Sequence, residues 1–313
     1  RAHKWGGMIL KKMQNITCVC TGLILMLVLF LNLLGVAMAT GTWDGVDMRI
    51  STAPNGAEST SGDSFSPSIS ADGQYVAFYS NASDLLPKDT NGKLDVFRKD
   101  TQTNELIRVS VGSNGVEGDG DSGIPAISGD GRYVVYYSYA TNLTDQYTNN
   151  KRQIFVRDIV NNTTTMASTA EDGVVGNNDA NDLPGISRDG RYIVFSSTAT
   201  NLGAGLYGAY GQVYVKDTHT GKTTLASADQ YGNPAADGTD NQGPLHSISD
   251  DGNLVAFASK AALGINNTTQ CNNYALHNCY DIFIKNIQEG SIELISTNTV
   301  GELSNGDSWD VSI

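Results

Sequence analysis

Residues 69–80 read ISADGQYVAFYS, and three later stretches repeat this pattern: ISGDGRYVVYYS at 127–138, ISRDGRYIVFSS at 186–197 and ISDDGNLVAFAS at 248–259. Their Asp-Gly pairs begin at Asp72, Asp130, Asp189 and Asp251, so successive units are 58, 59 and 62 residues apart. Asp-Gly between two apolar runs is a strong hairpin signal, and a type I′ turn with positive φ at both residues is expected. A recurring unit of this length indicates a repeat fold.

Each unit contains four short segments with strand character. In the first unit these are a segment ending at Ile69, then QYVAFYS at 74–80, DVFRK at 95–99 and LIRVSV at 106–111. The second segment is apolar at almost every position, which is typical of a strand covered on both faces. The sequence therefore predicts an all-β fold, a β-propeller of four-stranded antiparallel blades. Stacked β-sandwiches would need roughly 100 residues per unit, which this repeat does not have.

Partial units are expected at both ends of the repeat region. MRIST at 48–52 matches the fourth strand of a unit, and GDSWDVSI at 306–313 matches GDSFSPSI at 62–69, where a unit begins. We therefore expect four full repeats with a partial first and last blade, in a propeller that is incomplete at its C-terminus.

The N-terminal segment is typical of a signal peptide. Lys11 and Lys12 precede an apolar run from Leu23 to Leu34, and Ala37-Met38-Ala39 has small residues at the positions of a cleavage site. We expect a signal peptide over 1–39, with residues 1–7 upstream of a start at Met8, and a propeller domain over 40–313. An uncleaved membrane anchor is the alternative, because the apolar run approaches spanning length.

The charge of the chain narrows its partners. The formal net charge is −13, and residues 1–39 hold four Lys or Arg and no acidic residue, so the remainder is more acidic still. An acidic protein repels phosphate groups, so no nucleic acid is expected as a partner. Contact with a membrane is expected only through the signal or anchor segment.

The segment CNNYALHNC contains Cys271 and Cys279, the two cysteines beyond the signal segment. In an oxidising compartment this pair is expected to form a disulfide across a small loop. The alternative is a zinc site that includes His277, but the spacing lacks a CxxC or HxxxH pair and offers no fourth ligand nearby.

The pattern P-x-I-S-x-D-G-x-Y-V-x-F, followed by D-x-N-G-x-x-D-V-F, resembles the WD40-like β-propeller repeats of bacterial exported proteins, which are related to TolB-type propellers. The resemblance covers about residues 41–313. It implies a propeller exported to the periplasm, the cell surface or the medium. It implies no single activity, because propellers of this kind include scaffolds, sensors and domains attached to enzymes.

One loop has a candidate calcium site. In DTNGKLDVFRKD at 89–100, Asp89, Asn91 and Asp95 are spaced like the first ligands of a calcium loop. The glycine is displaced from its usual position, and Asp100 lies too far along an extended strand to complete the same site. Calcium held by these three residues and backbone carbonyls is one hypothesis; an Asx turn without metal is the other.

Two further features are candidates for binding. His246 stands where the other units have Pro67, Pro125 and Pro184, on the strand expected to face the central channel. Acidic residues recur just before that strand and could form a ring of negative charge or simply cap turns: Asp63, Asp119, Asp121, Asp179, Asp182, Asp237, Asp240 and Asp307.

Two functions stay open. No GxSxG motif and no Ser-His-Asp arrangement occurs in the sequence, so we assign no catalytic residue and no certain cofactor. The favoured hypothesis is an exported, non-catalytic scaffold that binds a protein, peptide or glycan. The alternative is the propeller domain of a longer peptidase, hydrolase or sensor whose catalytic part lies beyond Ile313.

Overall fold

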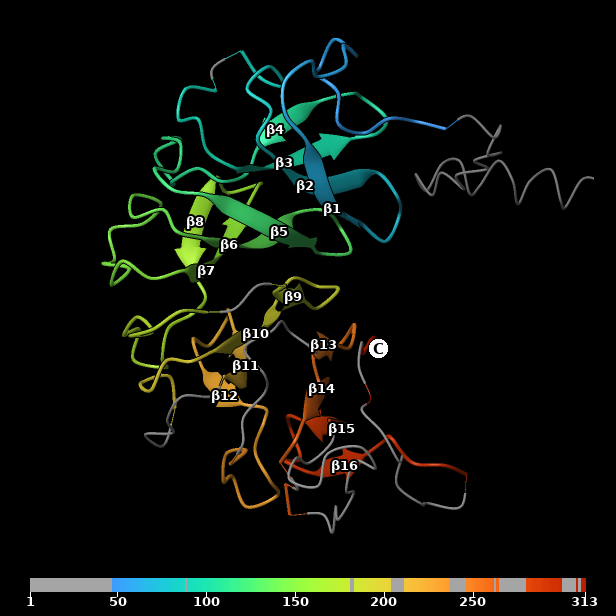
Figure 1. The fold of residues 1–313 in the computed structure, drawn as a ribbon, viewed down its shortest axis with the longest axis vertical. Coiled ribbons are helices and arrows are strands. Elements are labelled where there is room, and N and C mark those ends of the chain that lie inside the picture. The colour runs from blue at the N-terminus through green and yellow to red at the C-terminus, as the bar shows by residue number, and fades with distance from the viewer. Residues whose placement is uncertain are drawn as a thin grey trace, which may run out of the picture. The chain divides into compact units, whose positions relative to one another are not determined.

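The computed structural model describes residues 47–87, 89–180, 183–203, 211–236, 246–261, 263–264, 280–299, 308 and 311–313. Residues 49–313 belong to one compact unit. The described residues form sixteen β-strands in four antiparallel four-stranded sheets, each ordered as its strands follow in the chain, and no helix. The fold is an all-β propeller of four-stranded blades, as the repeat predicts (Figure 1).

Each blade contains the four segments of one repeat. Blade 1 consists of β1 (Ser64–Ile69), β2 (Tyr75–Ser80), β3 (Asp95–Asp100) and β4 (Leu106–Arg108). Blade 2 consists of β5 (Ser122–Ile127), β6 (Tyr133–Ser138), β7 (Gln153–Asp158) and β8 (Thr163–Met166). Blade 3 consists of β9 (Gly185–Ile186), β10 (Tyr192–Ser197), β11 (Gln212–Asp217) and β12 (Thr223–Leu225). Blade 4 consists of β13 (His246–Ile248), β14 (Leu254–Ser259), β15 (Asp281–Asn286) and β16 (Ile292–Leu294).

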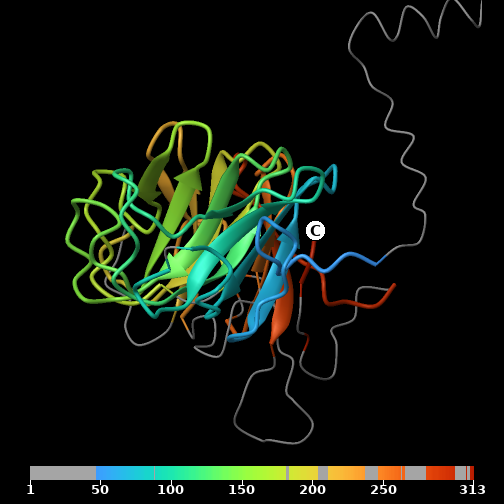
Figure 2. The same cartoon turned by 90° about the horizontal axis from the view of Figure 1, so that it is seen from above.

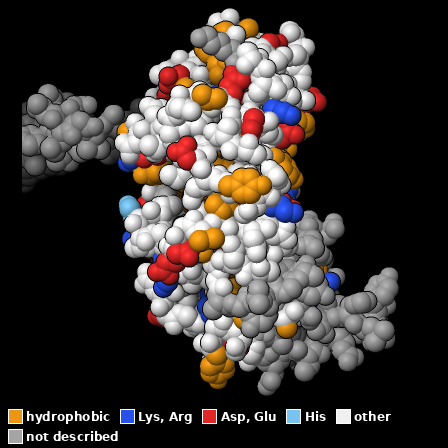
Figure 3. Space-filling model, turned by 90° about the vertical axis from the view of Figure 1, so that its left-hand side faces the viewer, with side chains coloured by type: hydrophobic (Ala, Val, Ile, Leu, Met, Phe, Trp, Pro, Cys, Tyr) orange, Lys and Arg blue, Asp and Glu red, His pale blue; other side chains and the backbone are white. Residues whose placement is uncertain are grey.

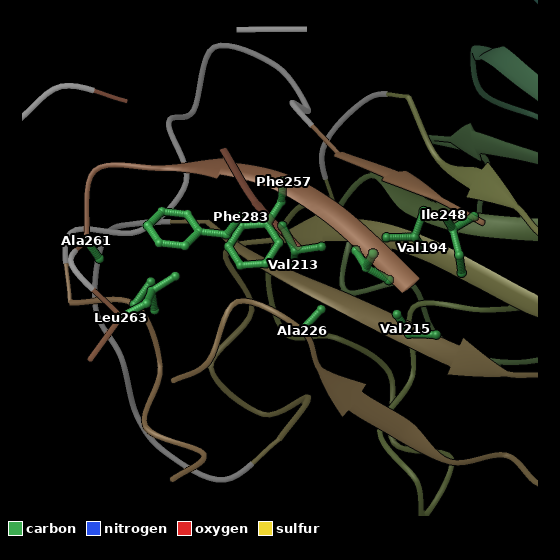
Figure 4. Packing of buried hydrophobic residues seen from close by; sticks show 11 residues of the cluster. Val194, Val213, Val215, Ala226, Ile248, Phe257, Ala261, Leu263 and Phe283 are labelled. Atoms are coloured by element: carbon green, nitrogen blue, oxygen red, sulfur yellow. The ribbon is translucent and has the colours of Figure 1, made fainter. Parts of the chain in front are cut away.

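The core lies between the blades. Apolar side chains on one face of a sheet pack against the opposite face of the next sheet, and seen from above the sheets stand next to one another (Figure 2). Between blades 3 and 4, for example, Val213 lies beside Phe257 and Phe283, and Val194 lies beside Ile248 (Figure 4). Every blade has an aromatic pair across its second and third strands, such as Phe257–Phe283 with centroids 5.9 Å apart. The second strands are covered on both faces, and most of their residues are apolar.

The Asp-Gly turns differ from the expected type I′. Gly73 has a φ of 76°, but Asp72 is not among the positive-φ residues. Ser70 N pairs with Tyr75 O at 2.9 Å, so four residues separate the paired ends instead of two. Asp72 Oδ1 accepts hydrogen bonds from Ser70 Oγ (2.7 Å) and Gln74 N (3.0 Å), which holds Asp72 in an Asx turn with ordinary φ. The type I′ prediction was therefore wrong.

The same turns join neighbouring blades. Ala71 N donates to Gly129 O at 3.0 Å, Gly129 N to Arg188 O at 2.8 Å, and Arg188 N to Asp250 O at 3.0 Å. Gly131 also lies against the ring of Tyr75 in the preceding blade, where an added Cβ would come within 2.1 Å of Cδ2. Glycine is thus required here by contact between blades as well as by its positive φ.

The partial units at the two ends form no strand in their described residues, but they make contacts found in the full units. Residues 49–52 form no named strand, although Thr52 makes the isolated bridge to Glu58 that Val111 makes to Glu117 in the next unit. At the other end, Ile313 N donates to Ser247 Oγ at 3.3 Å, as Ile127 N does to Ser68 Oγ at 3.2 Å. Both ends therefore follow the repeat in their contacts.

Candidate functional site

The proposed calcium residues do lie together, at the start of β3. Asn91 Nδ2 donates to Asp95 Oδ2 at 3.0 Å and to the carbonyl oxygen of Gly118 at 3.0 Å. Asn91 Oδ1 accepts from Lys93 N at 2.9 Å, which closes an Asx turn. Ser110 Oγ donates to the other Asp95 oxygen at 2.6 Å.

A guanidinium group contacts these carboxylates. Arg108, at the end of β4, lies 3.4 Å from Asp89 Oδ1 through Nη2 and 3.5 Å from Asp95 Oδ2 through Nε, and it also pairs with Glu117. The Arg108, Asp89 and Asp95 side chains are almost fully buried. Arg108 thus faces carboxylate oxygens that calcium would also need. These contacts do not test calcium binding, so calcium at Asp89, Asn91 and Asp95 stays a prediction from the sequence.

The electrostatics of this charged cluster, which we define as Asp89, Asp95, Arg108 and Glu117, reflect its burial. Burial raises the pKa of Asp89. The positive charge of Arg108 opposes this rise, and the negative charge of Glu117 adds to it. Burial likewise raises the pKa of Asp95 against the hydrogen bond from Ser110 and the charge of Arg108. For Glu117, burial is outweighed by the N–H of Thr90 and by Arg108, so its pKa is lowered.

Sequence analysis missed Arg108 and Glu117, although the repeat contains a signal for both. Arg108 pairs with Phe97 where blades 2, 3 and 4 have Met166, Leu225 and Leu294. Glu117 stands where the later units have Val175 and Pro234. The N-terminal partial unit has the same two charges, Arg49 and Glu58, which also form an ion pair. In the later units these positions are apolar, so the first two units have an ion pair where the later units have apolar residues.

Three of the described acidic residues before the inner strands accept hydrogen bonds through their carboxylates. Asp119 accepts from Thr141 N and Oγ1, both at 2.6 Å. Asp121 Oδ1 accepts from Leu94 N at 3.0 Å, and Asp179 Oδ1 from Arg152 N at 2.8 Å. On the face drawn in Figure 3, acidic side chains are scattered among uncharged ones. These contacts favour turn capping over a ring of negative charge; Asp182, Asp237, Asp240 and Asp307 lie outside the described residues.

A hollow of about 490 Å³ lies among the inner strands β1, β5, β9 and β13 of all four blades. In three of them the residue before the proline has a positive φ: Ser66 at 46°, Ile124 at 44° and Leu183 at 65°. In β1 and β5 this produces a bulge, because the register with the second strand shifts at that point. A β-branched residue such as Ile124 rarely adopts this conformation, and such strain is concentrated at functional sites.

His246 lines this hollow, in the place expected from the sequence. It is only 9% exposed, and neither ring nitrogen has a hydrogen-bond partner among the described residues. Burial lowers the pKa of His246 to about 4, with the backbone groups of Val194 and Leu183 opposing this shift. Those backbone groups are near the ring without hydrogen-bond geometry. The imidazole is therefore neutral at physiological pH.

Two of the predicted features cannot be placed. Cys271, Cys279 and His277 lie outside the described residues, as does the segment 1–39. Within the described part of the chain, no group of three or more His, Cys, Asp or Glu side chains is arranged to hold a metal ion. The same part of the chain has no helix of the length and apolarity needed to cross a membrane.

Among known proteins, similarity to this chain is found in solved structures alone. No family model and no curated protein matches the chain. TolB from Acinetobacter baumannii is 19% identical with a TM-score of 0.43, covering 79% of this chain and 46% of its own. The β-propeller domain of the Trilobed protease from Pyrococcus furiosus is 12% identical with a TM-score of 0.42, covering 76% and 57%. The chain thus spans about half the length of these proteins.

The four repeated sheets define the class of the protein: it is an all-β propeller with four-stranded blades. Within that class it is similar to TolB-type propellers.

Proposed function

We propose that this protein is an exported, non-catalytic propeller scaffold that binds a ligand at the hollow between its inner strands. The observation that supports this most directly is the hollow itself, to which all four blades contribute and which includes a buried histidine with no hydrogen-bond partner among the described residues. Concave sites of this size with a few polar groups are typical of ligand binding. The strained residues Ser66, Ile124 and Leu183 at its wall support the same proposal.

Export is the second part of the proposal. It is supported by the basic and apolar pattern of residues 8–39 and by the small residues at 37–39. The acidic composition is consistent with a protein that stays soluble outside the cytoplasm.

Photo-crosslinking tests the binding role. A photoreactive residue replaces Ser66 at the hollow, and in a control it replaces Thr103, which is exposed in the turn between β3 and β4. After exposure to an extract of the source cells, we expect a discrete adduct from the Ser66 variant and none from the Thr103 variant. Equal labelling of both variants, or of neither, would reject binding at the hollow.

A further inference from the structure

The inner strands differ at one position that faces the hollow. Pro67, Pro125 and Pro184 line it in blades 1 to 3, and His246 lines it in blade 4. Pro67 lies in the bulge and is skipped by the strand pairing, whereas His246 is in register opposite Phe257. Blade 4 thus presents an imidazole where the other blades present a pyrrolidine ring.

The imidazole has unused hydrogen-bonding capacity. A neutral histidine has one N–H donor and one nitrogen acceptor, and both ring nitrogens of His246 lack a partner among the described residues. A buried polar group without a partner is unfavourable, so a bound molecule that supplies hydrogen bonds would relieve this cost. The hydroxyl groups of Ser66, Ser68 and Ser247 line the same hollow.

The lining has no charge. Its described residues are proline, serine, aliphatic residues, glycine and the one histidine, which is neutral at physiological pH. A charged group in the hollow would lose its hydration without gaining an opposite charge. The lining therefore favours an uncharged ligand.

An added peptide strand fits this wall poorly. The inner strands are the edges of their sheets, but proline has no N–H to offer a new strand, and bulges disrupt an edge further. Recognition therefore depends on side chains that both donate and accept, namely hydroxyl groups and imidazole. A hydroxyl-bearing ligand matches such groups, because each of its own hydroxyls also donates and accepts.

We propose that the hollow binds an uncharged, hydroxylated small molecule of mono- or disaccharide size, and that His246 is its specificity-determining residue. This rests on the proposed function, since it names the ligand class of the same site. The aliphatic and proline side chains would contact the C–H faces of such a ligand, while His246 and the serines would bond its hydroxyl groups.

Titration calorimetry with the purified full chain tests this, using a panel of neutral mono- and disaccharides. We expect at least one to bind, with roughly 10-fold weaker binding for His246→Leu and His246→Pro, since a lost hydrogen bond to a buried site is worth about one factor of ten. The matched control is His219→Leu in the exposed turn after β11, which should bind like the native protein. Circular dichroism and thermal melting confirm that each variant is folded. The Leu variant is included because it keeps the backbone N–H of residue 246, which the Pro variant loses.

Three results would overturn the inference: no neutral saccharide binds, a sugar phosphate binds as tightly as the sugar, or the His246 variants keep full affinity. If the Ser66 crosslink yields a specific adduct with a peptide or a charged molecule, only the ligand class is wrong. If neither the crosslink nor calorimetry detects a ligand, the proposed function fails as well.

Discussion

A single arginine changes the chemistry of blade 1. Arg108 stands in a position that is Met or Leu in the other blades, and it faces three carboxylates in a nearly closed environment. Its guanidinium also lies over the ring of Phe97, 5.9 Å from the centroid. Removing one partner of a buried ionic group costs more than the group contributes, because the remaining charges are left without compensation.

Replacing Arg108 with Met, the residue of blade 2, should therefore destabilise the protein by about 3–5 kcal/mol. Urea unfolding at neutral pH measures the change. Adding Glu117→Val, the residue of the next unit, removes one uncompensated carboxylate and should recover part of the loss. An Arg108→Met variant as stable as the native protein would show that the cluster contributes nothing.

Calcium can be tested on the same loop. If Asp89, Asn91 and Asp95 bind the ion, millimolar calcium should raise the melting temperature of the native protein, and Asp89→Ala should abolish the rise. A melting temperature that does not move with calcium ends the metal hypothesis.

The Arg191–Asp217 pair gives a pH-dependent prediction. Arg191 Nε and Nη2 donate to the two Asp217 oxygens at 3.0 and 2.7 Å, and these bonds hold the pKa of Asp217 well below its ordinary 3.8. A folded pKa below the unfolded one stabilises the fold above about pH 4, and this contribution is lost as pH falls toward the folded pKa. Asp217→Asn should thus lower the free energy of unfolding at pH 7, with a smaller difference at about pH 2.5. A difference that stays constant between the two pH values would contradict the assignment.

At the scale of the strand, the third strand of each blade has a buried cation bonded to the preceding repeat. Lys216 and Lys285 each donate through Nζ to carbonyl oxygens of the turn that follows the last strand of the preceding blade. Lys99 donates in the same way to Thr52 and Ala53 in the partial unit before blade 1. Arg157 has the same place in blade 2 and reaches Gly112 O at 3.4 Å. Burial lowers the pKa of all four cations. This recurring contact links each blade to the one before it.

Lys216→Met should lower the free energy of unfolding by about 1–3 kcal/mol, because it leaves buried carbonyl oxygens without a donor. Those oxygens belong to Thr169, Ala170 and Gly221. The matched control is Lys222→Met in the exposed turn of the same blade, which should change stability by less than about 0.5 kcal/mol. Equal effects of the two substitutions would rule out the linking role.

At the scale of the whole molecule, stability comes from interfaces between repeats. Three of the four core clusters join two neighbouring blades, whereas the fourth has all its buried residues within the first repeat. The inner strands of the four blades then meet at a shared hollow that no single repeat contains.

Export of the molecule can be tested with a fusion. Residues 1–39 placed before alkaline phosphatase, which needs disulfides formed outside the cytoplasm, should yield active enzyme, and Leu27→Arg in the apolar run should abolish it. A mature protein beginning at Thr40 shows cleavage, and a membrane-bound fusion with its first residues intact shows an anchor instead.

For the exported chain, thiol titration should detect Cys271 and Cys279 only after reduction. Free thiols without reductant would contradict the disulfide.

The repeat alone was sufficient to predict the fold class, the strand order within each blade and the position of His246 at the inner wall. Local patterns suffice for these features, because strand alternation, turn residues and unit length depend on residues close together in the chain. The Asp-Gly turn was assigned the wrong type even though its determinants are local: Ser70 Oγ and Gln74 N, which bond Asp72, are each two residues from it, and the Ser recurs before the Asp-Gly pair of every repeat.

Tertiary structure decided which polar residues meet. Arg108 and Glu117 join Asp89 and Asp95 across 28 residues of chain, so the residues predicted to bind calcium lie beside a guanidinium that the sequence did not indicate. That His246 has no hydrogen-bond partner among the described residues likewise depends on how the blades surround it. Repeat patterns specify the scaffold through short-range rules, whereas the site depends on burial and long-range contacts that form only when the blades pack together.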